Sequence, residues 1–159
     1  MAKKNLSLAG GILLLISVFL PTLFVYFHVD YFGVESTMMA FYWMFGYTYA
    51  TMSAQGYGQS VSASATHFDL DIIGVVCMAI IILGAILALV TASKSNSKMP
   101  LVGGLLGIVG MIIFLGSFYA DVSSVHYVSE VAVGVVAPFI GAWLCIIGGI
   151  IAIIGGASN

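Results

Sequence analysis

Charged residues are what this sequence has least of. Only 6% of its 159 residues are Asp, Glu, Lys or Arg, as four lysines, no arginine and six acidic residues, whereas about a quarter of the residues in an average soluble domain are charged. A soluble domain of this length would therefore lack the charges to cover its surface. Nucleic-acid binding is also excluded, because four lysines cannot form the clustered basic surface that contacts phosphates. Two cysteines are too few for a disulfide-stabilised secreted scaffold.

Long apolar runs are what the sequence has in abundance. Hydrophobic residues make up 62% of the chain, and a helix needs about 20 of them in a row to cross the hydrocarbon core of a bilayer. Backbone groups in lipid must be hydrogen-bonded within the segment, so charge-free runs of this length are predicted to be helices. Four runs qualify: residues 6–27, 72–92, 101–120 and 131–154. The sequence therefore predicts that residues 1–159 form a single integral membrane domain of the all-α class, a four-transmembrane-helix bundle.

The charges are sorted to opposite ends of these predicted spans. The lysines precede the first span or lie in the link 93–100, and the acidic residues lie in the two longer loops: Lys3, Lys4, Lys94 and Lys98 against Asp30, Glu35, Asp69, Asp71, Asp121 and Glu130. Positive residues favour the cytoplasmic side. We therefore expect a multi-pass cell-membrane protein with cytoplasmic termini and with residues 28–71 and 121–130 outside the cytoplasm.

The first outer loop carries an alternating pattern that is typical of strands. Residues 37–51 place aromatic side chains at every second position, and period 2 puts them on one face of a strand: Phe41, Trp43, Phe45, Tyr47 and Tyr49. A Gly-rich turn, Gln55-Gly56-Tyr57-Gly58, separates this run from a second alternating run, 59–66. The pattern predicts an extracytoplasmic β-hairpin or small sheet.

The aromatic face of this hairpin has two interpretations. It can pack on the protein's own outer surface or lie as an aromatic belt at the level of the lipid headgroups. Alternatively, the aromatic face or a free strand edge can contact another protein by stacking or by strand addition. The five aromatic residues are the candidate partner-contact residues under the second interpretation.

Candidate metal ligands are the three histidines, His28, His67 and His126, which all fall in the predicted outer loops. Histidine with carboxylate suits zinc, and histidine with methionine suits copper. No H-x-x-x-H, H-x-H or C-x-x-C spacing is present, so no metal or other cofactor is expected. The sequence also contains no nucleophile motif, P-loop or dinucleotide fingerprint, and its predicted spans lack the ionisable residues of coupled transporters. We therefore expect a non-enzymatic protein.

Small residues at spacing four mark candidate helix contacts. Gly103 and Gly107 form a GxxxG pair in the third predicted span, and the fourth span carries similar small-residue stripes, which include Gly141, Gly148, Gly149 and Ala152. Such residues let helix backbones approach closely. They either build the bundle of one chain or mediate its self-association.

The arrangement resembles the claudin and peripheral myelin protein superfamily. Leu20-Pro21 near the outer end of the first span is similar to the family's Leu-Pro, and Gly141-Ala142-Trp143 followed by Gly148-Gly149 is similar to its fourth-span glycines and tryptophan. The resemblance implies cytoplasmic termini and a first outer loop rich in β-strand. The family's W-G-L-W-C-C motif is absent, because this loop has only Trp43 and no cysteine. Sealing or pore residues of the family are therefore not transferred.

These observations favour a non-enzymatic tetraspan protein that acts in assembly or adhesion. The outer loop would contact a second copy, giving a homo-oligomer, or a larger membrane protein complex. One alternative is an accessory subunit of a respiratory or metal-dependent membrane enzyme, with the three histidines near a cofactor. A second alternative is a pore for small solutes, which would need a polar path through the bundle; Ser17, Thr22 and Thr91 offer little material for one.

Overall fold

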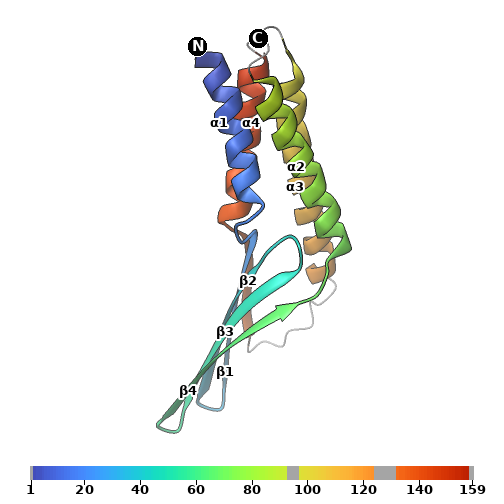
Figure 1. Ribbon diagram of the computed structural model, residues 1–159. Coiled ribbons are helices and arrows are strands. Elements are labelled where there is room, and N and C mark those ends of the chain that lie inside the picture. The colour runs from blue at the N-terminus through green and yellow to red at the C-terminus, as the bar shows by residue number, and fades with distance from the viewer. Residues whose placement is uncertain (1, 93–96, 124–131, 158–159) are drawn as a thin grey trace.

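Helices and a β-sheet occupy opposite ends of the molecule (Figure 1). The computed structural model describes residues 2–92, 97–123 and 132–157, and this part of the chain contains four helices and five strands. The helices are α1 (Ala2–Ser17), α2 (Ile72–Thr91), α3 (Met99–Ser123) and α4 (Ile140–Ala157). The strands are β1 (Leu23–Tyr31), β2 (Val34–Tyr42), β3 (Tyr47–Gly56), β4 (Gln59–Phe68) and β5 (Ala132–Pro138). They form one antiparallel sheet in the order β4-β3-β2-β1-β5.

Three helices are long and apolar enough to cross a membrane. These are α2, α4 and the stretch Met99–Ala120 of α3, with mean hydropathies of 3.1, 2.2 and 2.3. Helix α1 is shorter, with 16 residues, and it lies beside α4 (Figure 1). The start of α1, the end of α2, the start of α3 and the end of α4 all lie at the end of the helices that is far from the sheet. The chain is therefore a membrane-associated protein with its sheet beyond one end of the apolar helices.

The predicted all-α four-transmembrane-helix fold is wrong, because the protein is a mixed structure in which a five-stranded sheet accompanies the helices. The first predicted span, 6–27, is helical only to Ser17, and its last five residues belong to β1. The fourth, 131–154, contains β5, and its helix starts at Ile140. Both misassigned segments are rich in β-branched or aromatic residues; Pro21 lies two positions before β1, and Pro138 is the last residue of β5. Apolar strands that pair with neighbours cannot be told from helix by hydropathy alone.

The single aromatic strand predicted over 37–51 is also wrong. The chain reverses between β2 and β3, where the amide of Gly46 donates to the carbonyl of Trp43 (3.0 Å) and the amide of Trp43 donates to the carbonyl of Tyr47 (2.9 Å). The hairpin predicted at Gln55–Gly58 is present, because β3 and β4 pair from Tyr47–Phe68 to Gly56–Gln59. The four strands β1 to β4 thus follow one another as three successive hairpins, which explains the length of the first loop.

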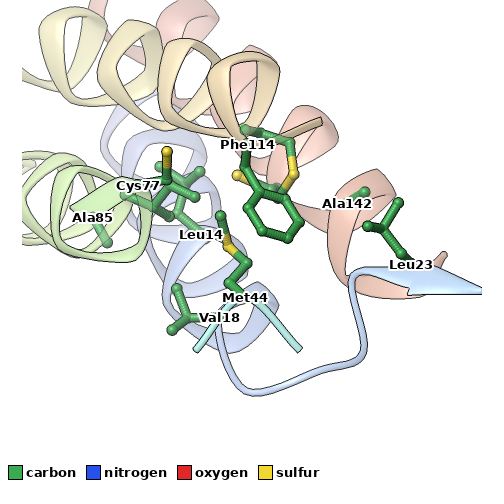
Figure 2. Close-up of a cluster of buried hydrophobic side chains, with 11 residues drawn as sticks. Leu14, Val18, Leu23, Met44, Cys77, Ala85, Phe114 and Ala142 are labelled. Atoms are coloured by element: carbon green, nitrogen blue, oxygen red, sulfur yellow. The ribbon is translucent and has the colours of Figure 1, made fainter. Parts of the chain in front are cut away.

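The β2–β3 turn fastens the sheet to the helices. Met44, at its centre, is fully buried, and Figure 2 shows it among Leu14, Val18 and Phe114. Beside it, the amide of Asp69 donates to the carbonyl of Gly46 (3.1 Å). The chain can then enter α2 directly, because the Asp71 carboxylate accepts from the amide of Gly74 (3.0 Å) and caps the first turn of the helix.

The small residues singled out in the sequence lie at helix contacts within the chain. A Cβ at Gly103 would overlap the carbonyl oxygen of Gly84 on α2, and Gly107 packs against Leu14 of α1. In α4, Gly148 and Ala152 meet α1, Gly149 meets α3, and Gly141 meets the carbonyls of the segment between α1 and β1. The helices approach this closely because glycine removes the side chain at each crossing point.

Candidate functional site

The five predicted contact residues do not share one strand face. Phe41 lies on β2, Tyr47 and Tyr49 lie on β3, and Trp43 and Phe45 lie in the turn between them. The turn separates the set into two groups with different neighbours. Both groups lie at the end of the sheet nearest the helices (Figure 1).

Phe41 belongs to an aromatic cluster within the chain. Its ring centroid lies 5.4 Å from that of Phe24 on β1 and 5.3 Å from that of Phe139, which precedes α4. The third side of the triangle, Phe24 to Phe139, is 5.9 Å. These separations are typical of packed aromatic pairs, so Phe41 ties β1 and β2 to the start of α4.

Trp43, Phe45 and Tyr47 form a second aromatic group. The Trp43 and Tyr47 centroids are 5.0 Å apart, and those of Phe45 and Tyr47 are 6.4 Å apart. The indole Nε1 of Trp43 donates to the carbonyl oxygen of Phe19, just after α1 (3.1 Å). An amphipathic ring with a satisfied N–H where apolar helices end is the arrangement of a membrane-interface belt.

One face of the sheet, which we call the hydroxyl face, carries a group of hydroxyl side chains in its middle rows. Cross-strand partners line up Thr37 with Ser53 and Ser62, and Thr51 with Ser64. Together with methionine and alanine side chains they line a hollow of about 310 Å³, and a neighbouring hollow of about 180 Å³ continues toward Glu35 and Gln55. Hydroxyl and amide groups of this kind hydrogen-bond neutral polar partners such as peptide groups.

The opposite face, which we call the apolar face, carries aliphatic, aromatic and thioether side chains. Its central rows are Val25, Ala40, Ala50 and Ala65, and then Phe27, Met38, Met52 and Ala63. Met52 and Val61 are exposed on this side. The two faces therefore differ in their middle rows, where hydroxyl groups gather on one side and apolar side chains on the other.

Strand β4 is an edge of the sheet. All ten of its residues are exposed, and its sequence, QSVSASATHF, contains no charged residue and no proline. Edge strands are ordinarily protected from pairing by lysine, proline or bulges. Next to this edge, Tyr49 and Tyr47 lie directly opposite Thr66 and Phe68. An unprotected edge with aromatic side chains beside it is suited to contact with another chain.

The sequence interpretation missed three aromatic residues at the far end of the sheet. Tyr31 and Phe32 lie at the β1–β2 turn and Tyr57 at the β3–β4 turn, and all three are exposed. A signal was present, since Phe32-Gly33 and Tyr57-Gly58 are aromatic–glycine pairs between alternating runs. The first pair was overlooked because β1 was assigned to a transmembrane helix.

The two histidines that the structure describes are not brought together. His28 on β1 lies 3.3 Å through Nδ1 from the Thr37 hydroxyl, whereas His67 lies on β4 opposite Thr48, three strands away. His126 is outside the described residues. Among those that are described, no group of three His, Cys, Asp or Glu side chains is placed to hold a metal ion.

Two of the three hydroxyls considered for a solute pore are turned toward their own helices. Ser17 donates to the carbonyl of Leu14 (2.6 Å), and Thr91 donates to that of Leu87 (2.5 Å). The third, Thr22, is buried and lies in the segment before β1 rather than within a helix. These three side chains do not form a polar path along the helices.

No protein-family model matches the chain, and no curated protein matches its sequence.

Proposed function

We propose that this protein is a non-enzymatic membrane protein that acts in assembly, through contact of its sheet with a second copy or with a larger membrane complex. The observation that carries the proposal is the uncharged, fully exposed edge strand β4. Its outer backbone groups can pair with a strand of another chain, which gives affinity without any special side chain.

The aromatic residues beside the edge give this contact its specificity. Tyr47 and Tyr49 belong to the strand paired with β4, and Phe68 at the end of β4 is 59% exposed. Large aromatic side chains are enriched among the residues that contribute most to protein interfaces. Phe41 and Trp43 contribute indirectly, because their contacts with Phe139 and with the Phe19 carbonyl hold β2 and the β2–β3 turn against the helix ends.

The direction of pairing follows from how the strands run. Strand β4 runs from the far end of the sheet toward the helices, so two copies anchored side by side in one membrane present it in the same direction. Antiparallel ladders are slightly more stable than parallel ones and suit a two-fold axis across the strands. A pair of copies that face each other from opposed membranes therefore pairs most favourably, which fits a role in adhesion.

Lysines placed on the edge test this proposal. Ala63→Lys with Ala65→Lys puts two charges on β4, and like charges on facing strands oppose pairing. We expect the native mass of the detergent-extracted protein to fall from that of an assembly to that of the single chain. A matched control, Ser53→Lys with Gln55→Lys, adds two charges at the same spacing on the interior strand β3, where both residues are exposed.

The control variant should retain the mass of the wild-type assembly. The proposal fails if the wild-type protein is already a single chain with no co-purifying partner. It also fails if the β4 variant keeps the wild-type mass.

A further inference from the structure

The far ends of the two hairpins carry an aromatic group that the fold does not need. We call Tyr31, Phe32 and Tyr57 the tip cluster; they are 61%, 77% and 85% exposed. The ring centroids of Tyr31 and Phe32 are 4.4 Å apart with their planes at 79°. The Tyr57 hydroxyl donates to the carbonyl oxygen of Phe32 (3.1 Å), which joins the two turns. The three rings therefore form one fixed surface.

The two turns at this surface need a positive φ at a position where each carries a bulky aromatic residue. Phe32 has φ of 51° and Tyr57 has φ of 49°, each followed by a glycine with φ of 77°. Two positive φ values in a two-residue turn are the type I′ pattern, which strongly favours Asn, Asp or Gly at the first position. Bulky aromatic residues are rare there. Strain that persists in a structure is found preferentially at functional sites, so these two rings are expected to have a role beyond closing the turns.

The distance of the tip cluster from the helix ends, and the charged residues near it, indicate the kind of surface that it contacts. Strand β1 has nine residues, so the cluster stands about 30 Å from the helix ends at roughly 3.3 Å per residue, beyond the reach of the lipid around the helices. The chain has no lysine or arginine between Lys4 and Lys94, which removes attraction to anionic surfaces. Asp30 and Glu35 lie directly opposite each other in the row behind the rings, so only the aromatic layer can enter an apolar phase.

We propose that the tip cluster inserts into the zwitterionic headgroup region of a second, opposed lipid bilayer. Tyrosine and phenylalanine at the convex end of a hairpin suit this layer, since an aromatic ring with a polar end prefers the boundary between water and hydrocarbon. The carboxylates behind the rings set the depth and favour zwitterionic over anionic lipid. This contact is independent of the β4 edge.

Asparagine substitutions test the proposal without harming the turns. Phe32→Asn with Tyr57→Asn creates Asn-Gly turns, the preferred sequence for type I′ geometry, so the thermal midpoint should stay the same or rise. With the helices held in phosphatidylcholine nanodiscs, co-flotation with phosphatidylcholine vesicles should fall at least about tenfold, since two buried rings are lost. Phe32→Trp should keep the binding and show a blue-shifted emission on vesicles.

Three results would overturn this inference: no binding of the wild-type protein to phosphatidylcholine vesicles, unchanged binding of the asparagine variant, or stronger binding to phosphatidylglycerol vesicles. A change in native mass of the asparagine variant without vesicle binding would show that the tip meets a protein instead. The edge variant Ala63→Lys with Ala65→Lys should bind vesicles as the wild type does. Failure of the assembly proposal and failure of this one are therefore distinguishable.

Discussion

At the scale of the residue, glycine positions decide where the sheet joins the helices. Gly46 has φ of 91°, a region that residues with a side chain rarely adopt, and a Cβ there would overlap the backbone carbonyl of Asp69. Glycine is therefore required at position 46 for two reasons: the backbone is left-handed there, and it lies in close contact with the segment that enters α2. Gly58 shares the positive φ, at 77°, but nothing lies within 4 Å of its added Cβ.

This difference gives a matched pair of substitutions. Gly58→Ala adds only the conformational cost of a left-handed alanine, so the free energy of unfolding should fall by about 1–2 kcal/mol. Gly46→Ala adds the steric overlap with Asp69 and should cost about 2–4 kcal/mol. Thermal unfolding followed by circular dichroism in one detergent measures both. Equal midpoints for the two variants would contradict the close contact between the turn and α2.

At the scale of the element, the helices are held together by glycine contacts. Gly84 of α2 and Gly103 of α3 face each other, and Gly104 of α3 faces Gly149 of α4. Apolar helices in lipid gain nothing from burying apolar side chains, because lipid is equally apolar, so close packing must supply the attraction. One methyl group at such a contact separates the helix backbones and weakens packing along both helices.

Gly103→Ala is predicted to destabilise the α2–α3 pair by about 1–3 kcal/mol, the usual cost of overpacking. Gly116→Ala on the same helix is the control, since nothing lies within 4 Å of its added Cβ. That substitution should be neutral, or stabilising by up to about 1 kcal/mol. The thermal unfolding midpoints of both variants are measured in the same detergent. A Gly103→Ala variant as stable as the Gly116→Ala variant would rule out the close crossing of α2 and α3.

At the scale of the whole molecule, charge is separated along the long axis. Lys4 and Lys98 lie at the end where α1 and α3 begin, whereas Asp30, Glu35, Asp69 and the other described acidic residues of the first loop belong to the sheet and its junction with α2. Positive residues are retained on the cytoplasmic side during insertion. We therefore expect the sheet to face away from the cytoplasm.

Thiol labelling tests this orientation. With Cys77→Ala and Cys145→Ala removing the two buried native thiols, a new cysteine at Ser62 should react with a membrane-impermeant maleimide in intact cells. A cysteine at Ser97, next to Lys98, should react only after the membrane is permeabilised. The reverse pattern would place the sheet in the cytoplasm and would rule out both proposed contacts outside it.

Much of the organisation could be predicted from the sequence, and the errors have a common cause. The shortage of charge indicated a membrane protein, and the alternation over residues 59–66 with its Gly-rich turn indicated the β3–β4 hairpin. Strands β1 and β5 were missed because Leu23–Phe27 and Ala132–Pro138 extend the apolar runs of their helices. Hydropathy measures how apolar a segment is and carries no information about its hydrogen-bond partners.

The candidate site was predicted only in part for the same reason. Period 2 placed Tyr47 and Tyr49 on one face of a strand, as in the structure, but it could not show that Gly46 reverses the chain and moves Trp43 and Phe45 into a turn. The tip cluster depends on Phe32 and Tyr57 coming together across two hairpins. Residues 25 positions apart meet only when the register of three strands is fixed.

The sequence by itself determined the kind of solvent that this chain needs, because the number and position of charges are local properties that lipid and water sort without reference to the fold. Only the tertiary structure decided which apolar segments are strands, which strand is left as an edge and which aromatic rings reach the far end of the sheet. Strand pairing joins segments that are distant in sequence, so its outcome depends on all of its partners at once.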